Sequence, residues 1–264
     1  MLYWVWGVRI VDYDELLSVA TAVGESLLEN GAEIYRVEES VSRIVGAYGV
    51  QEVDVFAIPN CLITTVVRQD GKSLTKIKRI LSRGTNLDRV NRLNDLCRRV
   101  CRDRPELSQV RRELEEILRR PVYGLAVKTL AYGITAFAFT LFFGGNLWDA
   151  LCALLFGAAI KQVAFQMEKL HSNAFFVNTV CSALTAALAM LAVRLGLAAN
   201  MDKMVIGTLM NLVPGVAITN SMRDIIAGDL VAGLTKMTEA LLVATAMAVG
   251  AGLALSASHL LGGG

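Results

Sequence analysis

The chain has 264 residues, of which 54% are hydrophobic, and its formal net charge is only +2 at pH 7. So high an apolar fraction is unusual for a soluble domain. A net charge this close to zero argues against the clustered basic excess of a nucleic-acid-binding protein. The composition therefore predicts a chain that is partly embedded in a membrane and does not bind nucleic acid.

The charged residues are distributed unevenly along the chain. Residues 1–120 hold 19 of the 26 Lys and Arg residues and 18 of the 24 Asp and Glu residues. The sequence that follows, from Pro121 onward, is poor in charge and rich in apolar residues. We therefore predict two domains, a water-soluble domain over 1–120 and a membrane domain over 121–264.

The first domain begins with two predicted helices. Apolar residues recur at helical spacing from Tyr13 to Leu28, and the following Asn30-Gly31 is a typical C-terminal stop signal. A second apolar stripe at helical spacing predicts a helix over 33–48.

The period of the sequence then changes from that of a helix to that of a strand. The runs EVDVFAIP (52–59) and CLITTVVRQDG (61–71) are β-rich and meet at Pro59-Asn60, which predicts a hairpin. The run SLTKIKRIL (73–81) is a candidate third strand. Two amphipathic helices follow, over 87–102 and 106–119. The predicted fold of this domain is α+β, in the order helix, helix, hairpin, helix, helix.

This first domain lacks the motifs of common enzymes. It contains no phosphate-binding loop, nucleophile elbow or zinc-protease motif, and no histidine precedes His171. Glu33, Glu38 and Glu39 could form a carboxylate pair, but carboxylates on an amphipathic helix are usually solvated. The five cysteines lack zinc-ligand spacing. We therefore predict no enzymatic activity, no cofactor and no metal site.

The second domain contains about five segments that are long enough to cross a membrane, because a spanning helix needs about 20 apolar residues. These segments are 122–143, 147–167, 174–196, 203–221 and 230–258. The predicted architecture of this domain is thus all-α and polytopic. Basic residues near the ends of the spans predict that the first domain lies in the cytoplasm. The membrane is then expected to be the inner (plasma) membrane of the cell. An odd number of spans would place the C-terminus outside.

One segment concentrates helix breakers and charges between two apolar runs. Residues 211–229 read NLVPGVAITNSMRDIIAGD. Proline removes a backbone donor and should free carbonyl groups around Leu212 and Val213. Unwound backbone at membrane depth is tolerated only where it is buried in protein or lines a cavity, and broken helices build substrate sites in many transporters. The alternative is a kinked helix that is followed by an ordinary loop.

Charged residues next to this break could bind a solute. An Arg–carboxylate cluster can hold a zwitterionic or anionic solute, and a titrating carboxylic acid can couple transport to a proton. We predict that Arg223 holds a substrate carboxylate and that Asp224, Asp229 or Glu239 is the coupling acid. The full set predicted for substrate binding and coupling is Asn211, Pro214, Gly215, Asn220, Arg223, Asp224, Gly228, Asp229, Lys236 and Glu239.

Two stretches of the sequence resemble the signatures of the threonine/serine exporter family. In 30–67 the resemblance rests on Gly31-Ala32, Tyr35-Arg36-Val37-Glu38 and Phe56-Ala57-Ile58-Pro59. In 212–241 it rests on Pro214-Gly215, Asn220, Arg223-Asp224, Gly228-Asp229 and Gly233. The two motifs occur in order on either side of the domain boundary. The resemblance implies a cytoplasmic α+β domain, a membrane domain and the export of small amino acids.

The chain departs from the fused members of that family, because it stops after about five spans and lacks a second set. It therefore resembles the domain-bearing subunit of the split members, which are linked to dicarboxylate, particularly succinate, export. This resemblance implies a second small membrane subunit with matching spans. A higher oligomer is a further expectation. Small residues at Ala246, Gly250 and Ala254 offer a close-packing face for that partner. The rival interpretations are a membrane-anchored enzyme or sensor, and a non-transporting assembly subunit.

Overall fold

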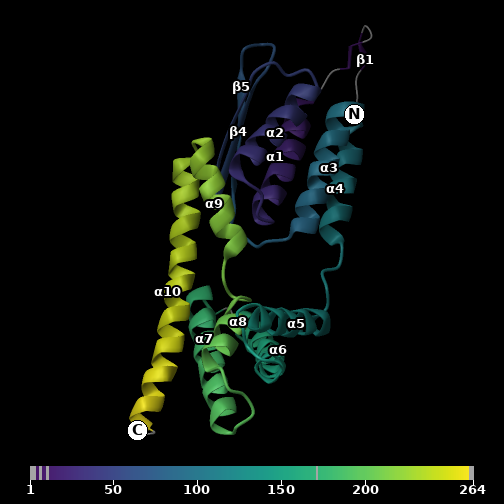
Figure 1. Cartoon of the computed structure of the whole chain (residues 1–264). Coiled ribbons are helices and arrows are strands. Elements are labelled where there is room, and N and C mark those ends of the chain that lie inside the picture. The colour runs from purple at the N-terminus through teal and green to yellow at the C-terminus, as the bar shows by residue number, and fades with distance from the viewer. Residues whose placement is uncertain (1–3, 6–7, 10–11, 171, 262–264) are drawn as a thin grey trace. The chain divides into compact units, whose positions relative to one another are not determined.

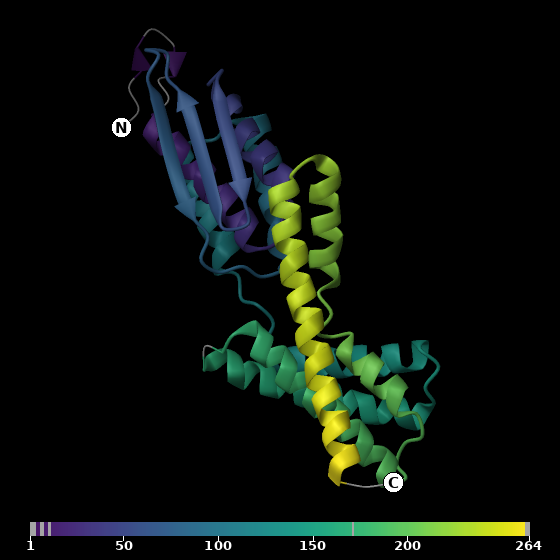
Figure 2. The ribbon, with the colours of Figure 1, turned by 90° about the vertical axis from the view of Figure 1, so that its left-hand side faces the viewer.

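The computed structural model describes residues 4–5, 8–9, 12–170 and 172–261. The chain divides into two compact units (Figures 1 and 2). The first combines Met1–Pro121 with Val216–Met237, and the second combines Val122–Gly215 with Thr238–Gly264. The first unit thus contains a segment from the C-terminal half of the chain.

The elements of the first unit match the sequence prediction closely. Two short strands, β1 (Trp4–Val5) and β2 (Val8–Arg9), pair near the N-terminus. The remaining elements before Pro121 are α1 (Tyr13–Glu29), α2 (Ile34–Ala47), β3 (Val53–Ile58), β4 (Cys61–Val67), β5 (Ser73–Arg79), α3 (Leu87–Asp103) and α4 (Leu107–Arg119). The four predicted helices, the hairpin and the candidate third strand are all confirmed.

Local signals in the sequence explain where α1 begins and ends. The side chain of Asp12 accepts hydrogen bonds from the backbone N–H groups of Asp14 and Glu15, which satisfies donors that the first turn leaves free. At the other end Gly31 adopts a φ of 89°. The N–H of Ala32 donates to the carbonyl of Leu27, as in a Schellman motif. The predicted stop at Asn30-Gly31 is therefore confirmed.

Strands β3, β4 and β5 form an antiparallel sheet in that order. Ile58 pairs with Cys61, so Pro59 and Asn60 form the two-residue connection of the hairpin. Alternate residues of β4 are buried, because only one face of the sheet packs against the helices. Figure 2 shows the sheet in front of these helices. The core of the unit is filled by apolar side chains from α1, α2, α3 and α4 and from the inner sheet face.

The described residues of the second unit form helices and the loops that connect them. The unit contains α5 (Leu125–Phe142), α6 (Leu147–Lys169), α7 (Ala174–Arg194), α8 (Met201–Leu209) and most of α10 (Leu230–Leu261). Among the described residues, four helices are long and apolar enough to cross a membrane, namely α5, α6, α7 and α10. The predicted spans over 122–143, 147–167, 174–196 and 230–258 correspond to these four.

The predicted span over 203–221 is not among these four, and the helix break predicted within it at Pro214-Gly215 is confirmed. Helix α8 ends at Leu209, and α9 (Gly215–Ala227) begins only after an interruption. Pro214 cannot donate a backbone hydrogen bond, so the helical ladder cannot run through this position. From Val216 onward α9 belongs to the first unit.

The small-residue face of α10 packs within the chain. A Cβ atom at Gly250 would lie 2.1 Å from the carbonyl oxygen of Thr179 on α7, and Ala246 is fully buried. We expected these residues to face a separate subunit, but Gly250 instead packs against α7 of the same chain. Small residues here let two helices of this chain approach closely.

Candidate functional site

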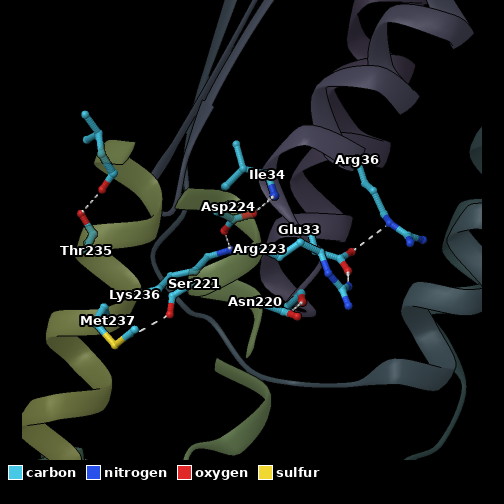
Figure 3. A network of polar contacts seen from close by, with 12 residues as sticks. Glu33, Ile34, Arg36, Asn220, Ser221, Arg223, Asp224, Thr235, Lys236 and Met237 are labelled. Carbon is cyan, nitrogen blue, oxygen red and sulfur yellow. Dashed lines mark hydrogen bonds and ion pairs between the residues drawn. The ribbon is translucent and has the colours of Figure 1, made fainter. Parts of the chain in front are cut away.

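The residues predicted to bind substrate or couple transport fall into two groups. Asn211, Pro214, Gly215 and Glu239 lie in the second unit. The remaining six lie in the first unit, and they are Asn220, Arg223, Asp224, Gly228, Asp229 and Lys236. The structure gathers several members of the larger group into one network with α2 (Figure 3).

A tight hairpin between α9 and α10 supports the network. Gly228 adopts a φ of 101°, a left-handed conformation that glycine adopts without strain. The N–H of Asp229 donates to the carbonyl of Asp224, which closes the end of α9. A Cβ atom at Gly233 would lie 2.5 Å from the side chain of Ile225 and 2.9 Å from the carbonyl of Ser221. Glycine at both positions therefore lets the two helices turn and pack closely, as Figure 2 shows.

Asp224 is the centre of the network. Its side chain is fully buried. One carboxylate oxygen accepts a hydrogen bond from Lys236 Nζ at 2.7 Å, and the other accepts from the backbone N–H of Ile34 at 3.2 Å. Ile34 is the first residue of α2, whose own N-cap residue, Glu33, makes no capping hydrogen bond with its side chain. Asp224 thus caps α2 from a distant part of the chain and places negative charge at the positive end of the helix dipole.

Glu33 forms a second ionic centre beside the first. Its carboxylate pairs with Arg223 from α9 and, at 3.1 Å, with Arg36 from α2. Glu33 is only 8% exposed, whereas the side chain of Arg223 is 49% exposed. The expectation that Glu33 is solvated is therefore wrong, because α9 covers it and supplies a cation. Asn220 adds a hydrogen bond to the carbonyl of Gly31 at 3.1 Å.

Two further carboxyl groups lie at the edge of this network. Burial raises the pKa of Asp229 above its ordinary value, and the nearby charge of Asp224 raises it further. Burial also raises the pKa of Glu38, which accepts a hydrogen bond from the N–H of Ala57 at 2.7 Å. The charge of Asp229 contributes to that rise. These two groups favour the protonated state more than an exposed carboxyl group does.

The second-unit residues lie at and after the helix break. Asn211 donates from its side chain to the carbonyl of Tyr132 on α5 at 3.1 Å. The N–H of Gly215 donates to the carbonyl of Val213 at 2.9 Å. The carbonyl of Val213 thus lies outside the helical ladder, as expected, and it accepts this hydrogen bond instead. Glu239 is an exposed residue of α10.

Sequence reasoning included Lys236, a partner of Asp224, but it missed the partners of Arg223 and Asp224 on α2. Glu33 and Ile34 lie 190 residues away in the sequence, and no spacing rule connects positions so distant. The available signal was that one family-like motif contains Gly31, Arg36 and Glu38 while the other contains Asn220, Arg223 and Asp224. The structure shows that these two motifs meet.

Known proteins resemble this chain along most of its length. The model of a family described as "Putative threonine/serine exporter" matches residues 18–257. A protein of Escherichia coli (strain K12) named "Probable succinate transporter subunit YjjP" is 27% identical over 240 residues, which are 88% of this chain and 91% of that protein.

A "Threonine/serine exporter" of Corynebacterium glutamicum is 23% identical over 93% of this chain, yet the match covers only 52% of that protein. A "Probable threonine/serine exporter" of Mycobacterium tuberculosis (strain ATCC 25618 / H37Rv) is 20% identical over 89% of this chain and 45% of that protein. The chain thus spans about half the length of these two relatives. No solved structure matches it.

Proposed function

Since this chain belongs to the threonine/serine exporter family, we propose that it is one subunit of a two-subunit secondary exporter of small amino acids or dicarboxylates. The family is one of exporters rather than enzymes, and the four apolar helices make the chain a membrane protein. In our proposal the chain lies in the inner membrane with its α+β domain in the cytoplasm. A second, small membrane subunit supplies the facing spans that alternating access requires.

The observation that carries this proposal is the position of α10. This single helix of 32 residues contains a candidate membrane span, and its Lys236 binds the buried Asp224 that caps α2. An ionic network of the α+β domain is therefore attached directly to a spanning helix. We propose that the network transmits changes in the domain to α10 during the transport cycle.

The coverage of the relatives supports a split exporter. The chain matches nearly all of a protein named as a transporter subunit, but only about half of two longer exporters. In our proposal, a second subunit corresponds to the part of those longer proteins that this chain does not match. Their printed names suggest serine, threonine and succinate as the substrates to test first.

For proton coupling we propose Asp229, with Glu38 as its neighbour, because the pKa of both carboxyl groups is raised. The role of Arg223 as a substrate ligand stays a prediction. In this structure its guanidinium binds Glu33, so a substrate carboxylate would have to displace that partner.

Efflux from vesicles tests the proposal. Labelled serine, threonine and succinate are preloaded into vesicles that contain this chain alone, a candidate partner alone or both, and a pH gradient is imposed. We expect efflux only when both chains are present, and the preferred label identifies the substrate class. Efflux with this chain alone would contradict the two-subunit arrangement. Absence of efflux from correctly inserted protein in every arrangement would favour a non-transporting assembly or sensing role.

A further inference from the structure

Helix α6 buries a lysine far from both of its ends. Lys161 is only 9% exposed and lies on the same buried stripe of α6 as Gly157, Ile160 and Ala164. Eight residues separate it from the end of the helix at Lys169, a distance of about 12 Å at 1.5 Å per residue. The backbone of Lys161 therefore lies on the packed face of a candidate membrane span, about two turns before its end, and its side chain reaches to 3.9 Å from Glu168. Charged groups in such positions are rare and mark substrate or ion pathways.

The ammonium group of Lys161 is poorly compensated. Within the described part of the chain, no acceptor lies within hydrogen-bond distance of its Nζ atom. Its contacts are the ring of Tyr132, whose centroid is 5.2 Å away, and a carboxylate oxygen of Glu168 at 3.9 Å. The side chain of Glu168 is itself 59% exposed, so this ion pair is weak. An ammonium group has three donors, so Nζ of Lys161 retains hydrogen bonds that it can donate to a bound anion.

Tyr132 connects this lysine to the helix break. Its ring lies against Nζ of Lys161, while its backbone carbonyl accepts the side-chain hydrogen bond of Asn211. A Cβ atom at Gly157 would lie 2.4 Å from the same carbonyl, so α5 and α6 approach each other closely there. One residue of α5 thus contacts both the buried cation and the segment where α8 is interrupted. Interrupted helices are where transporters place their substrates.

We propose that Lys161 binds a carboxylate group of the exported solute. This inference rests on the proposed function, because amino acids and dicarboxylates both carry the carboxylate that a buried ammonium group recognises. The aromatic ring of Tyr132 holds the ammonium group in place while the site is empty. Lys128, by contrast, lies in the first turn of α5, where it can reach the membrane surface.

The test compares three variants of the full-length chain with its partner in vesicles. Lys161→Met keeps the length of the side chain but removes the charge, and Lys161→Arg keeps the charge. Lys128→Met is the matched control on α5. We expect Lys161→Met to lower serine or succinate efflux at least tenfold, as expected for loss of a charge-assisted hydrogen bond. Lys161→Arg should retain measurable efflux, and Lys128→Met should resemble the wild type.

A binding measurement separates this inference from the proposed function. In purified wild-type protein, serine or succinate should raise the thermal midpoint, and serinamide, which lacks the carboxylate, should not. Lys161→Met should lose this response while its own midpoint without ligand stays equal or rises, because methionine occupies the same packed position without a charge.

The outcomes are distinct. A ligand response that depends on Lys161, without efflux from any vesicle, supports the binding site and contradicts the exporter proposal. Wild-type efflux that Lys161→Met leaves unchanged overturns the inference and leaves the exporter proposal standing. A response to serinamide equal to that of serine would also overturn it, and absence of both efflux and ligand response contradicts both ideas.

Discussion

Two buried ionisable residues, Asp224 in the first unit and Lys161 in the second, have their charges compensated differently. Asp224 in the first unit accepts hydrogen bonds from Lys236 and from the N–H of Ile34. Among the described residues, Lys161 in the second unit contacts an aromatic ring and a carboxylate oxygen 3.9 Å away. A buried charge with its partners in place fixes the arrangement of helices, whereas a buried charge that lacks them is suited to receive a ligand. The comparison predicts that mutation of Asp224 mainly affects stability and that mutation of Lys161 mainly affects transport.

The largest expected effect on stability is that of Asp224→Ala. The variant leaves the cation of Lys236 without its carboxylate and the N–H of Ile34 without its acceptor. Breaking a buried ion pair from one side typically costs about 3 to 5 kcal/mol. We expect a correspondingly lower unfolding midpoint in thermal or denaturant unfolding of the purified protein.

The control for this variant is Asp88→Ala. Asp88 pairs with Arg92 at 2.9 Å on the surface of α3, and both side chains are well exposed. Exposed pairs of this kind contribute about 0 to 1 kcal/mol. Equal losses in the two variants would show that Asp224 is not the structural centre that its burial indicates.

A smaller loss is expected where α9 and α10 touch. In Gly233→Leu the new side chain would meet Ile225 and the backbone of Ser221, so the two helices must separate. Overpacking of this kind costs about 1 to 3 kcal/mol. Gly252→Leu is the matched change on the same helix, since nothing lies within 4 Å of a Cβ atom there.

Comparison of the unfolding midpoints of these two variants tests the hairpin. We expect Gly252→Leu to keep the wild-type midpoint or to exceed it, because leucine favours a helix more than glycine does. A midpoint for Gly233→Leu that is no lower than that of Gly252→Leu would contradict the close approach of α9 and α10.

The smallest effect concerns the pH dependence of stability. The pKa of Asp229 is raised, so folding favours its protonated form. Its contribution to stability is fully present below the ordinary Asp pKa of 3.8 and is lost as the pH rises through the raised pKa. Asp229→Asn should remove this loss. It should raise the free energy of unfolding near pH 7 by less than about 1 kcal/mol, which is the usual contribution of a partly exposed charge. Thermal midpoints of both proteins measured across the acidic range check the sign, and parallel curves would contradict it.

Local rules predicted most elements of the fold. The Asn30-Gly31 stop, the Pro59-Asn60 turn and the stripes of α3 and α4 depend on residues near one another in the sequence, and the structure agrees with each. Hydropathy alone favoured a span over 203–221, whereas the missing backbone donor of Pro214 predicted the break that the structure shows.

The candidate site was predicted only in part. Its chemistry could be recognised, because helix breakers beside charged residues are unusual between apolar segments. The network that Arg223 and Asp224 form with α2 could not be predicted, because Glu33 was interpreted as a solvated carboxylate. Lys161 was visible as a charge in a span, but no sequence rule shows whether a lysine there reaches the membrane surface or packs inside.

The sequence by itself determined the division into a charged and an apolar half, the α+β elements, four of the membrane helices and the resemblance to an exporter family. These features follow from composition, periodicity and short motifs, which depend on neighbouring residues. Only the tertiary structure decided that 216–237 joins the first unit, that Asp224 caps α2 and that Gly250 packs against α7. Those contacts join residues far apart in the chain, and which of them form is decided by the packing of whole helices rather than by any local preference.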